Sequence, residues 1–151
     1  MVCYRYFKNK KEIFDEAVKQ YAVESSQDVL ETVRDHATPF RERIDKLGQL
    51  MIYKEDGSRH HDFFHATGNE PFHLQLAVEM YKYLAPQISK ELTRLRDQGE
   101  ISVEDPALMT EFLLFGQLNL WISPGIDPHS PDFLRKISGI KGYILKLLEL
   151  N

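Results

Sequence analysis

Three histidines and one glutamate are the candidates for metal chemistry in this sequence. His61 and His65 are four residues apart, which on a helix would turn both rings to the same side. Glu70 and His73 have the Glu-x-x-His spacing of di-iron bundles, but such a centre needs a second copy of that motif, and none occurs here. A zinc protease would need His-Glu-x-x-His, which is also missing. A helical-bundle metal-binding protein or enzyme that uses these four residues is therefore the alternative interpretation.

Nothing in the sequence predicts a nucleophilic or nucleotide-dependent enzyme. Cys3 is the single cysteine, and no Gly-x-Ser-x-Gly elbow, phosphate-binding loop or dinucleotide fingerprint is present. A lone cysteine also excludes an intramolecular disulfide framework and fits a reducing cytosol. We therefore expect a cytoplasmic protein with no catalytic residue and no cofactor.

Aromatic and methionine side chains are more numerous than a small helical core requires. Walls of this kind suit a small lipophilic ligand that one or two hydrogen bonds orient. The residues predicted to line such a pocket are Met51, Phe63, Phe64, His65, Phe72, Leu76, Met80, Tyr83, Phe112 and Phe115. Most of them would also suit the core. The charge of the ligand stays open, because Glu79 and Glu111 could face a cation or water.

The chain that must position these residues has 151 residues, of which 42% are hydrophobic and 28% charged, with a formal net charge of −4. These values are typical of one globular domain. Its apolar strings are far shorter than the roughly 18 residues of a membrane span, so no membrane partner is expected. The charge is uneven, because residues 1–12 hold four basic side chains and one acidic one. This N-terminal segment is the region predicted to face phosphates.

The period of the apolar residues predicts an all-α fold. Asn9 and Glu12 have capping-box spacing, so a helix should begin near residue 10 and run to about residue 35. Thr38, Asp105 and Ser130 each precede a proline and predict three further helix starts. The later helices are expected at about 40–55, 71–98, 106–123 and 131–150.

Three features interrupt this pattern. Pro86 should kink its helix or divide it in two, because proline lacks a backbone donor and clashes with the preceding turn. Gly99, with Ile101 behind it, predicts a Schellman-type helix end. Residues 56–70 are the least regular stretch, for which we predict a loop with one or two helical turns.

The N-terminal segment Tyr4-Arg5-Tyr6-Phe7-Lys8-Asn9-Lys10-Lys11-Glu12-Ile13-Phe14 resembles the end of the helix-turn-helix in the TetR family of bacterial transcriptional regulators. In that family an aromatic string ends the recognition helix, and a short turn with a lysine leads into the helix that joins the DNA-binding and ligand-binding parts. Residues 96–101, followed by Asp105-Pro106-Ala107, resemble the turn before the family's penultimate helix. From residue 20 onward the resemblance is otherwise one of architecture.

The resemblance implies a transcriptional repressor that senses a small hydrophobic effector. Residues 1–8 would be the remnant of the recognition helix and turn, and residues 9–151 the effector-binding and dimerisation domain. The first two helices of the family's DNA-binding part have no counterpart here, so operator DNA is expected as a partner only of the intact form. The side chains of the remnant that could contact DNA are Tyr4, Arg5, Tyr6, Lys8 and Lys10.

The last helix has apolar residues at alternating spacings of four and three, as in the seam of a helical bundle. The helix before it is apolar nearly all round, and one monomer rarely covers two such surfaces. We therefore predict a homodimer in which the last two helices of each subunit form a four-helix bundle. The alternative is an internal core helix. The predicted interface residues are Leu118, Trp121, Phe133, Ile137, Ile140, Ile144 and Leu147.

Overall fold

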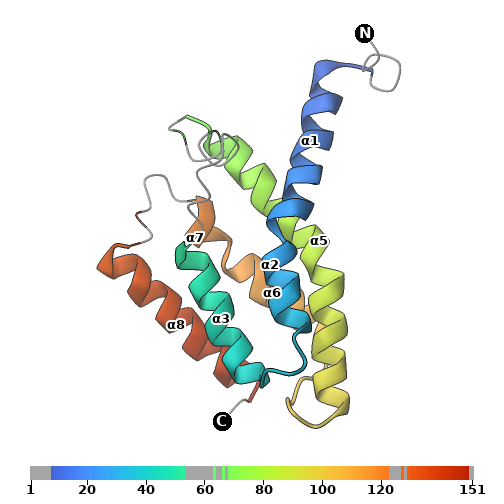
Figure 1. The fold of residues 1–151 in the computed structure, drawn as a ribbon, viewed down its shortest axis with the longest axis vertical. Coiled ribbons are helices and arrows are strands. Elements are labelled where there is room, and N and C mark those ends of the chain that lie inside the picture. Colours follow the sequence, from blue (N-terminus) through green and yellow to red (C-terminus); the bar gives the residue numbers. More distant parts are fainter. Residues whose placement is uncertain are drawn as a thin grey trace.

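The computed structural model describes residues 8–53, 63, 66, 68–122, 127 and 129–149. Throughout these residues the regular secondary structure is helical, which confirms the predicted all-α class (Figure 1). None of the described helices is both long and apolar enough to cross a membrane. The helices are α1 (Lys10–Ser25), α2 (Gln27–Arg34), α3 (Phe40–Tyr53), α5 (Glu70–Asp97), α6 (Pro106–Gly116), α7 (Leu118–Ile122) and α8 (Pro131–Leu147).

Side-chain caps fix the starts of three helices as predicted. The side-chain oxygens of Asn9, Asp105 and Ser130 accept backbone N–H groups from the first turns of α1, α6 and α8. The helix start predicted at Thr38-Pro39 is confirmed, since α3 begins at Phe40, but the Thr38 hydroxyl donates to Asp35 Oδ2 at 2.5 Å. Helix α3 begins without a cap from that side chain.

The helix expected over residues 10–35 is interrupted at Ser26. This residue is completely buried, and its hydroxyl and its N–H both donate back to the carbonyl of Ala22, the hydroxyl at 2.7 Å. Such back-bonding competes with the regular helical ladder and bends or ends helices. The helix expected over 106–123 is likewise divided at Gln117, whose side-chain amide donates to the carbonyl of Leu113 at 2.7 Å.

Helix α5 is continuous past Pro86, which lies on its exposed side. Water can reach the backbone there, so the missing donor does not divide the helix. The predicted stop after α5 is confirmed. Gly99 has a φ of +74°, and its N–H donates to the carbonyl of Arg96, while Glu100 N–H donates to that of Leu95. These two bonds define a Schellman motif.

Helix α5 is the centre of the bundle and is about 42 Å long. Helices α1, α2, α6 and α7 pack against it, and α3 packs between α2 and α8. The buried side chains form clusters along this axis. Between α1 and α5 lie Val18, Ala22 and Leu76; among α2, α5 and α6 lie Leu30, Tyr81, Leu84 and Leu114. A further cluster contains Phe40, Ile44, Leu92, Leu95, Ile101, Val103 and Leu148, and another Leu120, Phe133 and Ile137.

Candidate functional site

Three phenylalanines meet where α1 lies beside the first turns of α5. The rings of Phe14 and Phe72 are edge to face, with centroids 5.1 Å apart, and Phe63 lies 6.3 Å from Phe14 and 5.7 Å from Phe72. Edge-to-face contacts of this kind are favourable because the positive edge of one ring meets the negative face of another. Phe63 and Phe72 are 40% and 37% exposed, so the cluster lies at the surface.

A hollow of about 290 Å³ runs along α1 beside these rings. Its volume is at the lower end of the range for small-molecule sites. Within it, the side-chain amide of Gln20 donates to Glu24 Oε1 at 3.0 Å and holds that carboxylate in place. The hollow is lined by Phe14, Ala17, Val18, Gln20, Tyr21, Glu24 and Phe63.

Of the predicted pocket residues that the structure describes, Phe63 lines this hollow. Sequence reasoning did not assign the α1 residues of the hollow to a pocket. The signal it missed is a second stripe, since Ala17, Tyr21 and Glu24 recur at spacings of four and three beside the buried one. A helix that buries one face can present the adjacent face to a ligand.

The structure distributes the described members of the predicted pocket over several places. Phe63 and Phe72 meet at the surface, and Met80 packs both with buried Leu76 and against the cluster that Tyr83 also contacts. Met51 packs against a third cluster. Phe64 and His65 lie outside the described residues.

The prediction that Phe112 lines the pocket is wrong, because its side chain is 62% exposed on the outer side of α6. It lies two residues from buried Leu114, which on a helix puts the two on opposite sides. Phe115 is 43% exposed, and its ring meets that of Tyr81 edge-on at 5.5 Å.

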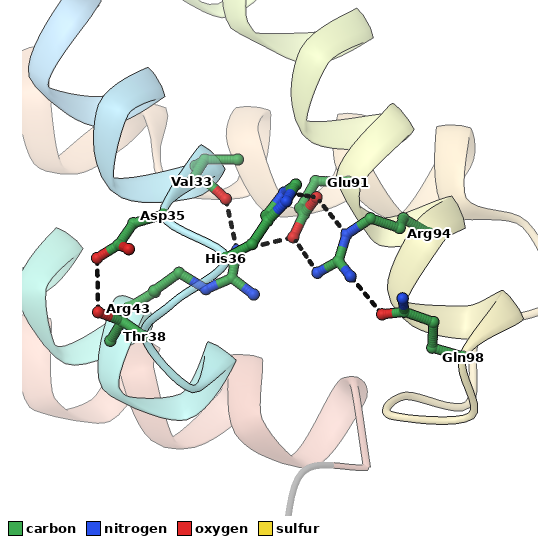
Figure 2. A network of polar contacts seen from close by, with 8 residues as sticks. All are labelled: Val33, Asp35, His36, Thr38, Arg43, Glu91, Arg94 and Gln98. Atoms are coloured by element: carbon green, nitrogen blue, oxygen red, sulfur yellow. Dashed lines mark hydrogen bonds and ion pairs between the residues drawn. The ribbon is translucent and has the colours of Figure 1, made fainter.

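An ion-pair network lies at the C-terminal end of α2 (Figure 2). From α3, Arg43 Nη1 donates to the carbonyl of Val33 at 2.5 Å and to Glu91 Oε1 at 2.7 Å. One turn along α5, Arg94 donates to both oxygens of Glu91, at 2.8 and 2.9 Å. His36 Nε2 lies 3.1 Å from Glu91 Oε2. The network therefore ties the end of α2 to both α3 and α5.

The carboxylate of Glu91 has a structural role, because it pairs with arginines of α3 and α5. Burial raises the pKa of its carboxyl group, but hydrogen bonds and charges from Arg94 and Arg43 outweigh burial and lower the pKa from 4.5 to about 2. The group is therefore ionised at neutral pH and poorly suited to general acid catalysis. Arg34, at the end of α2, adds a hydrogen bond to Gln87 of α5. Sequence reasoning missed this network because its members are far apart in the chain.

Helix α6 exposes an apolar stripe on the side opposite the core. Leu108, Phe112 and Phe115 recur at spacings of four and three and are 63%, 62% and 43% exposed. We call these three residues the α6 stripe. Exposed apolar side chains also occur on α8, where Leu134, Tyr143 and Leu147 are 41%, 67% and 40% exposed.

Most of the predicted α8 seam packs within the chain. Phe133 and Ile137 are buried with Leu120, and Ile140 is partly buried against them. This corrects the assignment of Phe133 and Ile137 to an intersubunit surface, because α3 packs against α8 and supplies the surface that covers them. The remaining predicted interface residues differ: Ile144 and Leu118 pack partly buried against core clusters, Leu147 is exposed, and the side chain of Trp121 lies outside the described part of the structure.

The predicted DNA-contact remnant is described only in part. Lys8 and Lys10 are exposed at the start of α1, where the N–H of Lys8 donates to Glu12 Oε2 at 2.6 Å. Tyr4, Arg5 and Tyr6 lie outside the described residues.

The described residues provide no arrangement of side chains that supports the metal-binding alternative. They contain no group of three metal-binding side chains, and His61 and His65 lie outside them. The carboxylate of Glu70 accepts the N–H of Gly68 at 3.1 Å next to the start of α5, and His73 also has a partner.

The described arrangement is suited to binding. It combines an aromatic hollow holding one carboxylate, an exposed apolar stripe and a buried carboxylate committed to ion pairs. Comparison with protein-family models and with curated proteins finds no match for this chain.

Proposed function

We propose that this chain is the effector-sensing and dimerising part of a cytoplasmic TetR-type repressor. The observation that carries the proposal is the α6 stripe, three large apolar side chains that are 43% to 63% exposed. Monomeric soluble proteins rarely leave such surfaces open, so the stripe supports an interface. With the exposed apolar residues of α8 it would build a two-fold interface from the last two long helices, as the resemblance implies.

The way α1 and α2 are held supports a sensing role. The end of α2 is fixed to α3 and α5 by the Arg43–Glu91 network. Helix α1 contacts α5 through an apolar cluster and through a hydrogen bond from Gln75 Nε2 to Asp15 Oδ1 at 2.9 Å. Ser26 separates these two segments. An effector in the hollow would bias the position of α1, and with it the basic end at Lys8 and Lys10, to the extent that it binds one position more tightly than another.

Light scattering combined with size exclusion tests the dimer on which this function depends. Phe112→Asp would place a carboxylate at the centre of the α6 stripe, where a partner would bury it unpaired. We expect a dimer for the natural chain and a monomer for this variant at micromolar concentration, a weakening of at least about a hundredfold. Circular dichroism should stay unchanged, because Phe112 is exposed in the single chain.

Leu74→Asp is the matched control, because Leu74 is a 37% exposed apolar residue of α5 and does not belong to the α6 stripe. This variant should remain dimeric. A natural chain that is monomeric, or a Phe112→Asp variant that dimerises with unchanged affinity, would overturn the proposal.

A thermal-shift screen with small lipophilic compounds tests the sensing half. A ligand that binds the folded state at a hundred times its dissociation constant adds about 2.7 kcal/mol of stability. At least one compound class should raise the melting temperature, and Phe63→Ala should remove the rise because Phe63 lines the hollow. A broad screen without any stabiliser would contradict a sensor role.

A further inference from the structure

The charge of the effector can be inferred from the side chains that line the hollow on α1. Among the described residues that line it, Glu24 is acidic and none is basic; the others are aromatic, aliphatic or amide groups. Glu24 and Tyr21 are three residues apart on α1 and therefore share one side of the helix. A ligand in the hollow would thus meet a carboxylate at one end and aromatic rings along its length.

The carboxylate of Glu24 has no cationic partner among the described residues. Its Oε1 accepts the amide of Gln20, a neutral donor, at 3.0 Å. The nearby lysine of the same helix, Lys19, pairs with Glu16 instead, at 3.4 Å. The second oxygen of Glu24 can therefore accept a charged donor or lie against a positive charge supplied by a ligand.

The aromatic rings of the hollow favour the same sign of charge. Phe14, Tyr21 and Phe63 all line the hollow, and the face of an aromatic ring attracts a cation through its quadrupole. An anionic ligand would be repelled by Glu24 and would gain nothing from the ring faces. A neutral ligand would not be attracted by the charge of Glu24.

We propose that the effector is a compact lipophilic organic cation, such as an aromatic quaternary ammonium compound. Its charge lies beside Glu24 and the ring of Tyr21, one turn away on α1, and its apolar part extends along the hollow towards Phe63. The hollow, at about 290 Å³, suits a small planar compound better than a large flexible one. This inference rests on the proposed sensor function, because it names the class of ligand that the sensor takes.

Titration of the full chain with two dyes of nearly the same shape tests the inference. The probes are 10-methylacridinium, a permanent cation, and acridine in alkaline buffer, where it is uncharged; binding is followed by their fluorescence. The cation should bind at least about tenfold more tightly. Glu24→Gln should weaken binding of the cation by about fivefold, as expected for an ion pair open to solvent, and leave acridine binding unchanged.

Glu31→Gln is the matched control, since Glu31 is an exposed glutamate of α2 that does not line the hollow. It should change neither affinity. Equal binding of both dyes, or a Glu24→Gln variant with unchanged affinity for the cation, would overturn the charge inference while leaving the sensor function intact. If neither dye binds, the inference also fails, and the thermal-shift screen with uncharged compounds decides separately whether the sensor function fails with it.

Discussion

Arg43 Nη1 lies 2.7 Å from Glu91 Oε1 in the interior of the bundle, although the two residues are 48 positions apart in the chain. The side chains are 2% and 8% exposed, so both charges have left bulk water. A buried ion pair adds little stability compared with a well-packed apolar pair. Removing one partner is nevertheless strongly destabilising, because the other charge is left buried without compensation. The relationship therefore fixes how α3 meets α5.

Replacing Arg43 with Met should lower the free energy of unfolding by about 3 kcal/mol, because Glu91 would lose its most deeply buried partner. Urea denaturation followed by circular dichroism measures the change. Arg135→Met is the control. Arg135 pairs with Asp132 on the surface of α8, where both side chains are mostly exposed, and its loss should cost well under 1 kcal/mol.

Removing both charges separates this explanation from a loss of packing. In the double variant Arg43→Met/Glu91→Met no buried carboxylate is left without its partner, so part of the lost stability should return. A double variant less stable than Arg43→Met alone would contradict the account.

The pKa of Glu91 predicts a dependence of stability on pH. Folding lowers the pKa of Glu91 from 4.5 to about 2. At pH values above 4.5 the ionised carboxylate therefore stabilises the fold by about 3 kcal/mol. This contribution is lost as the pH falls from about 4.5 towards 2, because protonation then breaks the ion pairs. Urea denaturation across this interval should show a smaller acid loss for Glu91→Gln than for the natural chain. Equal losses would show that Glu91 has an ordinary pKa.

The sequence predicts the helix ends better than it predicts the contacts between helices. Asn9, Asp105, Ser130 and Gly99 act through backbone groups a few residues away, so their chemistry can be recognised from spacing alone. Ser26 could not be recognised in this way. Its role depends on being buried, and burial depends on how α1 meets the rest of the bundle.

The sequence also does not show what covers the apolar side of each helix. Ile137 and Phe112 both belong to runs with helical spacing, yet one is buried in the chain and the other is 62% exposed. Spacing shows that a helix has an apolar side, but it does not say whether α3 or a second subunit covers that side. The second stripe on α1 indicates one wall of the hollow beside Glu24, but the position of Phe63 relative to α1 cannot be found from spacing.

The same substitution should have opposite effects at two glycines. Gly99 has a φ of +74°, so Gly99→Ala would strain the Schellman motif and cost about 1 kcal/mol. Gly48 lies inside α3, where an added Cβ would be 3.7 Å from Ile137 Cγ2, an ordinary contact. Gly48→Ala should therefore stabilise the fold by about 0.5 to 1 kcal/mol through helix propensity. Thermal unfolding should show melting temperatures that move in opposite directions; a shift of both in the same direction would refute this assignment.

The aromatic cluster predicts how firmly α1 is held. Phe72→Ala would remove the ring that meets Phe14 at 5.1 Å and Phe63 at 5.7 Å, a loss of about 1 kcal/mol in local contact energy. Amide hydrogen exchange should therefore become about fivefold faster in residues 10–17. Exchange in α2 should not change, because the Arg43–Glu91 network holds its end independently.

Leu74→Ala is the matched control for this measurement, since Leu74 lies in the same turns of α5 and has the same exposure of 37% as Phe72. It should leave exchange in residues 10–17 unchanged, because no ring contact is lost. If Phe72→Ala accelerated exchange equally in α1 and α2, the two segments would move as one body and Ser26 would not separate them. Acceleration confined to α1 is the expected result, and it is what a sensor needs if an effector beside α1 is to move that helix while the remainder of the bundle stays in place.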